Sequence, residues 1–145
     1  MRILTLSNLY PPFYVGGYEL RCAAITEALR ARGHDVRVLT SDHGLDTAPA
    51  PANQPHVRRL LRIHGYYGNP WLSLGRLQHL EIHNNQVLRD EIAAFKPDVV
   101  HVWCMNGLSK SLCLTLQQLG VRVVYDVSDH WILRSLTADV WLDWW

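Results

Sequence analysis

A glycine pair is the first feature of this sequence that could bind a ligand. Gly16 and Gly17 follow a short apolar segment, residues 2–6, and directly precede a helical pattern that begins at Tyr18. Backbone amides without a neighbouring Cβ can approach a ligand closely, and a helix N-terminus favours an anion. Arg21 could add a two-pronged contact to a phosphate, although an arginine there more often keeps its head in water. The pair alone would equally suit a simple turn.

A second group of polar side chains follows the last apolar segment of the chain. Asp126, Ser128, Asp129 and His130 lie within five consecutive positions. Carboxylates there could orient a hydroxyl group or accept its proton. The successive Ser, Asp and His do not form a catalytic triad, because adjacent side chains do not converge on one reacting atom. Asp129 could instead cap the segment that follows it.

Several motifs that would indicate other chemistry are absent. The sequence has neither the G-x-G-x-x-G fingerprint of dinucleotide binding nor the G-x-x-x-x-G-K-[ST] phosphate loop, and it lacks the G-x-S-x-G elbow of serine hydrolases. His79 and His83 are four residues apart, but Leu80 stands where a zinc protease needs glutamate. The spacing therefore favours a solvated helix flank, with no metal site, and an NAD-linked oxidoreductase is disfavoured.

Composition restricts the class of protein. The chain has 145 residues, 14 Lys+Arg against 13 Asp+Glu, and 48% hydrophobic residues, which predicts one folded domain and no affinity for nucleic acid. Cys22, Cys104 and Cys113 form no C-x-x-C pair, so a reducing compartment suits them better than a disulfide framework. No apolar run reaches the ~20 residues of a membrane span, and the first residues are too short and polar for a signal peptide. The expected location is the cytoplasm.

Strand and helix patterns alternate along the chain. The expected strands are residues 2–6, 36–40, 57–63, 99–102 and 121–127, and the expected helices are residues 18–32, 77–95 and 108–119. This alternation predicts an α/β fold, a Rossmann-like doubly wound parallel sheet in the order 3-2-1-4-5 with helices on both faces. Three arginines place residues 57–63 at an edge of the sheet. Residues 41–56 are rich in proline and predict a mobile surface loop with nothing to bury.

The first helix shows a weak amphipathic pattern. At about 100° per residue, its apolar residues form a wide arc, the pattern of a helix that packs on a sheet through that arc. The residues of the arc are Leu20, Ala24, Ile25, Ala28, Leu29 and Ala31, and those of the opposite side are Glu19, Thr26, Glu27 and Arg30.

Sheets of this kind bind ligands at the carboxyl ends of their strands. That rule selects residues 7–19, 101–108 and 126–131 as the site. Tyr66, Tyr67 and Trp71 could form a sugar-stacking or membrane-contacting patch, or simply pack a loop. The chain ends in an apolar segment with Trp141, Trp144 and Trp145, which indicates a fragment of a longer protein or a surface for pairing.

Taken together, the segments resemble the N-terminal domain of a family 4 glycosyltransferase of the GT-B fold. The matching segments are Met1 to Pro12, Val15 to Glu19, Leu29 to Ser41, Lys96 to Val102, Asn106 to Ser109, Val123 to Tyr125 and Asp129 to Trp131. The resemblance implies two Rossmann-like domains, of which residues 1–145 form the acceptor-binding one, and a C-terminal nucleotide-sugar domain that this chain lacks. It implies transfer with retention of configuration, no cofactor beyond the donor, and no turnover by this half alone.

The resemblance also implies roles for single residues. The expected catalytic residues are Asp129, Ser128 and His101, and the expected substrate-binding residues are Gly16, Gly17, Glu19, Arg21, Asn106, Asp126 and His130. Two positions depart from the family pattern, because Trp103 and Ser128 stand where members often carry histidine. The second departure removes a side chain often placed at the reaction centre.

The resulting interpretation is a hexosyltransferase-type enzyme. Its expected partners are a nucleotide-diphosphate sugar, a sugar or lipid-linked acceptor and the missing C-terminal domain. Arginines 58, 59 and 62 leave open a peripheral contact with anionic lipid at the inner face of the membrane. The alternative is a non-catalytic Rossmann-like binding or interaction module that pairs as a homodimer through its tryptophan-rich end.

Overall fold

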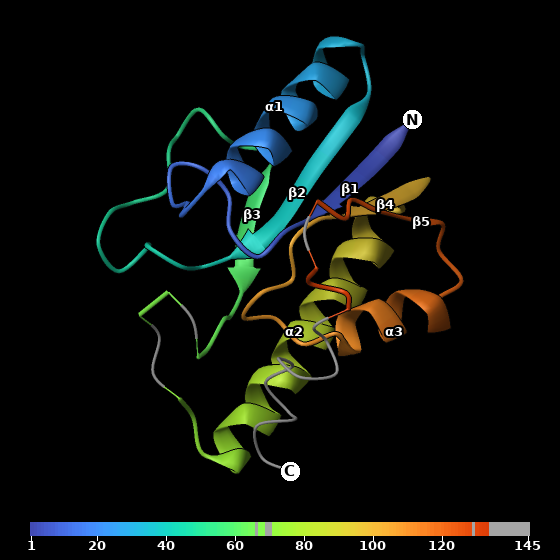
Figure 1. Cartoon of the computed structure of the whole chain (residues 1–145). Helices are drawn as coiled ribbons and strands as arrows, with labels where there is room; N and C mark the ends of the chain where they lie inside the picture. Colours follow the sequence, from blue (N-terminus) through green and yellow to red (C-terminus); the bar gives the residue numbers. More distant parts are fainter. Residues whose placement is uncertain (66, 69–70, 129, 134–145) are drawn as a thin grey trace.

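Five parallel strands form the centre of the molecule (Figure 1). The computed structural model describes residues 1–65, 67–68, 71–128 and 130–133. The strands are β1 (Arg2–Leu6), β2 (Asp35–Ser41), β3 (Val57–Leu61), β4 (Val99–Val102) and β5 (Val123–Tyr125). Their order is β3-β2-β1-β4-β5 and every pairing is parallel, which confirms the predicted topology and the place of β3 at an edge.

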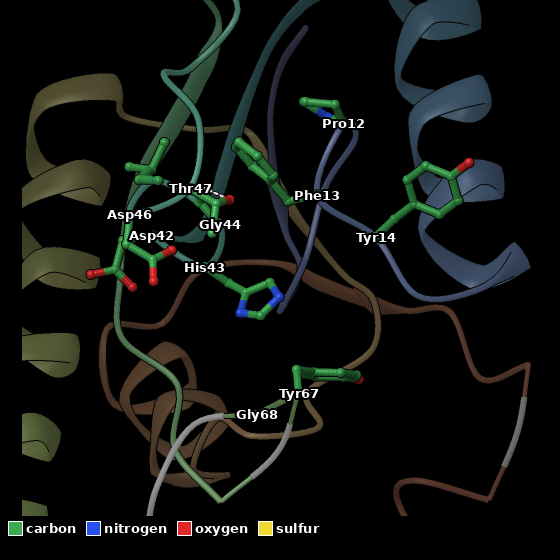
Figure 2. Close-up of a pocket in the computed structure, with 11 residues that line it drawn as sticks. Pro12, Phe13, Tyr14, Asp42, His43, Gly44, Asp46, Thr47, Tyr67 and Gly68 are labelled. Atoms are coloured by element: carbon green, nitrogen blue, oxygen red, sulfur yellow. Dashed lines mark hydrogen bonds between the residues drawn. The ribbon is translucent and has the colours of Figure 1, made fainter.

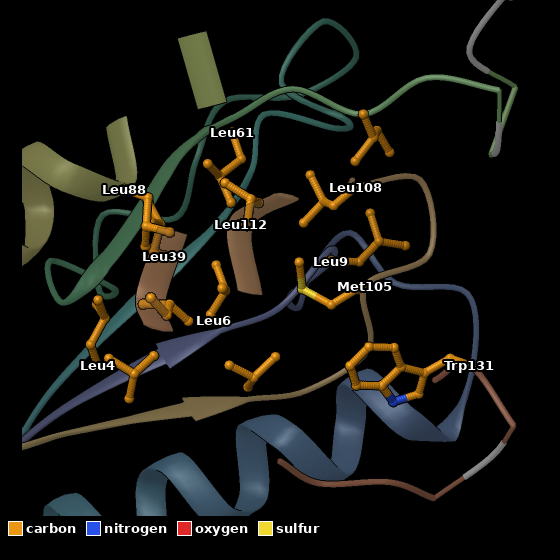
Figure 3. Close-up of a cluster of buried hydrophobic side chains, with 14 of the residues drawn as sticks. Leu4, Leu6, Leu9, Leu39, Leu61, Leu88, Met105, Leu108, Leu112 and Trp131 are labelled. Carbon is orange, nitrogen blue, oxygen red and sulfur yellow. The ribbon is translucent and has the colours of Figure 1, made fainter. Parts of the chain in front are cut away.

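Helices cover both faces of this sheet (Figure 1). They are α1 (Gly17–Ala31), α2 (Leu74–Phe95) and α3 (Ser111–Gln118). Because side chains alternate along a strand, Leu4 and Leu6 of β1 point to the face covered by α2 and α3, where they join one large apolar cluster (Figure 3). Burial of such a leucine stabilises the fold by about 2–3 kcal/mol. No helix in the described part of the chain is long and apolar enough to cross a membrane.

The face that α1 turns toward the sheet differs from the prediction. The residues it buries are Glu19, Cys22 and Thr26, whereas Leu20 and Ile25 of the expected arc are exposed, as are Ala24, Ala28 and Ala31. Cys22 is fully buried in a small cluster with Tyr10 and Val38. The pattern misleads because half of the arc is alanine, which gains little from burial, while compact Cys and Thr side chains fit closely against a sheet.

The edge strand is shorter than predicted, and one of its arginines does not point to solvent. Arg59 is buried, and its guanidinium donates hydrogen bonds to the carbonyl oxygens of Tyr10 (3.0 Å) and Pro11 (2.6 Å) and to Oε1 of Gln54 (3.0 Å). Arg58 pairs with Glu91 of α2 at 3.3 Å. The arginines therefore fix the loop after β1 and the helix beneath β3.

The segment after β2 is a surface loop, as predicted, because residues 42–56 are irregular and none of them is buried, but its start is anchored to the sheet. Ser41 is buried, and the amide of Asp42 donates a hydrogen bond to the carbonyl of Leu61 at 2.8 Å. A turn then follows at Gly44, whose φ of +85° favours glycine. This segment is anchored to β3 and positions side chains at the edge of the sheet where the strands end.

Candidate ligand site at the carboxyl edge of the sheet

Asn8 connects the loops that leave the carboxyl ends of the strands. Its side chain is fully buried, and its Nδ2 donates hydrogen bonds to the hydroxyl of Tyr67 and to the carbonyl of Asn106, both at 3.0 Å. Its own carbonyl accepts one from the amide of Ser41 at 3.2 Å. Asn8 thus joins the ends of β1, β2 and β4. The sequence signal for this role is a polar Ser-Asn pair directly after an apolar strand.

The glycine pair lies at the N-terminus of α1. Gly16 is the residue before the first helical position and has an extended backbone with φ −149°. A Cβ built on Gly17 would meet nothing within 4 Å, and one on Gly16 would meet only Oε2 of Glu19 at 3.9 Å. Neither backbone conformation nor packing in the described structure therefore requires glycine here. Glycine at these positions is still explained by the close approach of a ligand to the backbone amides.

Glu19 has a contact that the sequence does not reveal. It is buried, and its Oε2 accepts a hydrogen bond from the amide of Gly16 at 3.0 Å. A carboxylate in this position satisfies one of the free amides of the first turn and interacts favourably with the helix dipole. In the structure Glu19 caps α1, so its predicted substrate contact would have to coexist with this role.

Arg21, Asp126 and Ser128 come together from distant parts of the chain. Nη2 of Arg21 lies 3.0 Å from Oδ2 of Asp126, its Nη1 donates to the Ser128 hydroxyl, and that hydroxyl donates to Oδ1 of Asp126 at 2.7 Å. The guanidinium carbon sits 5.5 Å from the centre of the Trp103 ring. Arg21 is 54% exposed. Its guanidinium is therefore partly accessible to a ligand, while the Asp126 carboxylate fixes its orientation.

Tyr18 extends this cluster on the side of α1. Its hydroxyl donates to the carbonyl of Asp126 and accepts a hydrogen bond from the amide of Ser128 at 3.2 Å. Trp131, which is buried, donates from Nε1 to the same Asp126 carbonyl at 3.4 Å. The segment after β5 is therefore held against the first turns of α1.

His101 lies on β4 close to this cluster. Its ring centre is 4.8 Å from that of the fully buried Trp103. Burial lowers the pKa of His101, the nearby Asp126 carboxylate opposes this effect, and Arg21 adds to it. At neutral pH the imidazole is uncharged, so it can both donate and accept a hydrogen bond.

The remaining predicted residues are more dispersed. Asn106 lies on the other side of Asn8, where it borders Tyr67, and His130 is exposed after β5. Asp129 and Tyr66 lie outside the described residues, as do the three C-terminal tryptophans. Among the residues that the structure does describe, no three His, Cys, Asp or Glu side chains gather as a metal site would require.

A cavity of about 870 Å³ opens at the same edge of the sheet, at the ends of β1, β2 and β3 (Figure 2). Residues 12–14, 42–47 and 67–68 line it. Residues 12–14 fall within the predicted site segment 7–19, and Tyr67 within the predicted aromatic patch, whereas the sequence does not select residues 42–47 or Gly68. The turn at 42–47 has no periodic pattern, so its place at the strand ends could not be read from the sequence.

Comparison with known sequences identifies the family. Residues 16–145 match the Glycosyl transferase 4-like domain. The chain belongs to this family. An uncharacterized 42.6 kDa protein in the cps region of Klebsiella pneumoniae is 24% identical over 144 residues, which cover 92% of the present chain. The glycosyl transferase 4-like chain spans 38% of that relative's length.

Solved structures agree with this assignment at the level of the fold. MurG of Acinetobacter baumannii superposes with a TM-score of 0.60 at 13% identity, over 86% of this chain and 34% of its own. Sucrose-phosphate synthase of Thermosynechococcus elongatus superposes with a TM-score of 0.60 at 15% identity, over 95% of this chain and 35% of its own. The glycosyl transferase 4-like chain thus has the Rossmann-like fold of the N-terminal domain of a GT-B glycosyltransferase.

Proposed function

We propose that this chain is the acceptor-binding half of a retaining glycosyltransferase that transfers a hexose from a nucleotide-diphosphate sugar. One observation carries the proposal. The open amide of Gly17 and the fixed guanidinium of Arg21 lie within the first turns of one helix, at the carboxyl edge of the sheet. Helix amides and arginine are the groups that proteins use to bind phosphate.

The chemistry of sugar transfer gives these groups a role. When the bond between sugar and diphosphate breaks, negative charge develops on the departing phosphate oxygen. Donors that already point at that oxygen stabilise the charge without reorganising, most strongly when water is excluded. The amides at the start of α1 and the Arg21 guanidinium are suited to this task, and Asp126 holds the guanidinium in place.

The reacting sugars would contact the other predicted site residues. We assign His101, Ser128 and Asp129 to the reaction centre and Asn106, Asp126 and His130 to contacts with substrate. The neutral imidazole of His101 suits a hydrogen bond to a hydroxyl. Because Ser128 already bonds Arg21 and Asp126, we expect it to act mainly by positioning them. The donor is a co-substrate, and the proposal invokes no metal and no further cofactor.

A second domain is needed to complete the reaction. The chain spans 38% of the length of its Klebsiella relative. We propose that the rest of a longer protein binds most of the nucleotide sugar and that residues 1–145 alone show no turnover. Domain closure would then dry the cleft in which the transfer occurs.

A titration with UDP tests the proposal. In ¹⁵N-labelled protein, the amides of residues 15–19 should shift, with an affinity of the order of millimolar for the isolated half. The matched control is the Gly17→Ala variant, whose Cβ would meet nothing in the protein within 4 Å but would obstruct a ligand close to the amide. Shifts elsewhere, with residues 15–19 unmoved in the wild type, would favour a non-catalytic binding module instead.

Location and assembly belong to the same proposal. Three cysteines without a C-x-x-C pair, Cys22, Cys104 and Cys113, support a cytoplasmic protein. A peripheral contact with anionic lipid would depend on Arg58 and Arg62, which are exposed, and not on Arg59, which is buried. Sedimentation with anionic and neutral vesicles distinguishes these cases. Light scattering before and after removal of residues 141–145 tests the homodimer.

A further inference from the structure

The cavity at the ends of β1, β2 and β3 lies on the opposite side of β1 from the Arg21 cluster. Its walls come from residues 12–14, 42–47 and 67–68, whereas Asp126 and Ser128 follow β5 at the far edge of the sheet. Figure 2 shows Tyr14 on one side of the cavity and Asp42 and His43 on the other, with the Phe13 ring against Gly44 and with Tyr67 below them. The site therefore has two parts with different side chains.

Aromatic rings and carboxylates dominate the walls. Phe13 is half-buried, Tyr14 is 47% exposed, and Tyr67 is half-buried with its hydroxyl held by Asn8. Asp42 and Asp46 add carboxylates on the opposite wall. Aromatic faces suit the C–H surfaces of a sugar ring, and ionised carboxylates accept strong hydrogen bonds from its hydroxyl groups. Aromatic side chains and carboxylates together suit the binding of a polyhydroxylated ring such as a sugar.

The charge of the cavity limits what can enter it. Its lining contains two carboxylates and His43 but neither lysine nor arginine. Burial raises the pKa of the Asp42 carboxyl, and this effect outweighs the opposing influence of Arg62, His83 and His43. An anionic ligand would meet two acidic groups here, whereas an amino group would be attracted to them.

The cavity is held in shape before any ligand binds. The carbonyl of Gly44 accepts hydrogen bonds from Thr47, at 2.8 Å from Oγ1 and at 3.1 Å from the amide. Gly44 packs against Phe13 so closely that a Cβ would lie 2.3 Å from Cδ1 of that ring. The Arg59 guanidinium stacks 5.2 Å from the centre of the same ring. A prebuilt wall reduces the entropy lost on binding.

We propose that this cavity binds a polyhydroxylated ring that is neutral or carries an amino group, and that it rejects rings with a carboxylate or phosphate. Tyr14 and Tyr67 contact the apolar face of the ring, and Asp42 and Asp46 accept hydrogen bonds from its hydroxyl or amino groups. That the ring is the acceptor of the sugar transfer rests on the function proposed above. The division of charge between the two parts of the site assigns phosphates to the Arg21 side and uncharged groups to the Asp42 side.

Three sugars that share one ring test this charge preference. Methyl glucoside, glucosamine and glucuronate are neutral, cationic and anionic at pH 7. Saturation-transfer NMR on the full-length protein should show glucosamine and the glucoside binding at least tenfold more tightly than glucuronate. Glucuronate that binds as well as the glucoside overturns the proposal, and so does the absence of binding by all three.

Variants locate the binding. Asp42→Asn and Asp46→Asn should each weaken glucosamine binding by about tenfold, the value of a hydrogen bond to a charged group, and should narrow the difference from glucuronate. Asp90→Asn on α2, outside the cavity, is the matched control. Tyr14→Ala should weaken all ligands that bind, whereas Tyr14→Phe should not. Sugar binding that no cavity variant changes contradicts the proposal.

The experiment separates this inference from the proposed function. UDP binding at residues 15–19 reports on the transferase proposal and does not involve the cavity. Sugar binding that responds to Asp42 without any UDP binding would leave a saccharide site in a protein of another function. UDP binding without sugar binding at the cavity would keep the transferase and remove the subsite.

Discussion

The carboxylate of Glu19 accepts a hydrogen bond from the amide of Gly16 at 3.0 Å, so α1 carries an anion of its own at its first turn. The side chain is buried, which fixes this negative charge beside the glycine pair. One amide of the first turn is therefore already satisfied, and those that follow it remain open to a ligand. A diphosphate bound here would be a second anion near the first.

Glu19→Gln should remove the negative charge at the start of α1 while it keeps the hydrogen bond that caps the helix. Glutamine keeps an oxygen that can accept from Gly16, so the free energy of unfolding should fall by less than about 1 kcal/mol. Removal of the negative charge should tighten UDP binding by about two- to fivefold, the scale of a helix-terminus charge effect. Calorimetric titration measures the affinity. Glu27→Gln, at an exposed position of the same helix, should leave it unchanged, and weaker UDP binding by Glu19→Gln would contradict the argument.

Arg21→Met should reduce transfer without unfolding the protein. The ion pair with Asp126 is half-exposed, and such pairs contribute no more than about 1 kcal/mol to stability. The transfer rate of the full-length enzyme should fall by about 10- to 100-fold, because a donor to the leaving phosphate is lost. Arg30→Met removes an exposed arginine that pairs with Glu27 on the same helix and should be silent. Equal rates for the two variants would argue against a role for Arg21.

His101 should make the protein less stable in mild acid. Its pKa is lowered in the folded state from the ordinary 6.5, so below that pH the unfolded chain binds more protons. The free energy of unfolding should therefore rise with pH up to about 6.5 and then level off with respect to this group. Urea denaturation of wild type and His101→Gln between pH 5 and 7 measures the effect. His56, whose pKa is also lowered, remains in both proteins, so a wild-type slope no steeper than that of the variant would refute the role of His101.

Gly44→Ala should damage the wall of the cavity. Its φ of +85° strains an L-residue by about 1–3 kcal/mol, and the new methyl group would collide with Phe13. Gly33→Ala, outside the cavity, is the matched control, since its φ of +81° imposes a similar strain while its Cβ would meet nothing within 4 Å. Thermal denaturation should show a larger loss for Gly44→Ala, and sugar binding should weaken only in that variant. Identical losses would mean that Phe13 moves aside.

The sequence predicts the sheet well and the site only in part. Apolar strands that alternate with helical patterns predict a parallel sheet, and the predicted strand order 3-2-1-4-5 is correct. The orientation of α1 could not be obtained, because half of its apolar arc is alanine and the buried face consists of Cys22, Thr26 and a capping Glu19. The rule that ligands bind at strand ends selects Arg21 and Asp126 separately. Their pairing across 105 residues of chain depends on tertiary structure that no local pattern contains.

The buried amide of Asn8 has a consequence for how such a site can change. The Asn8 side chain donates one hydrogen bond to Tyr67 and another to the loop of Asn106. The loss of either hydrogen bond would cost about 1–3 kcal/mol. The bases of both loops are therefore fixed relative to each other, while the tip at 44–47 makes no bond to Asn8. New ligand preferences can arise by substitution at that tip, with the spacing between the phosphate side and the sugar side preserved.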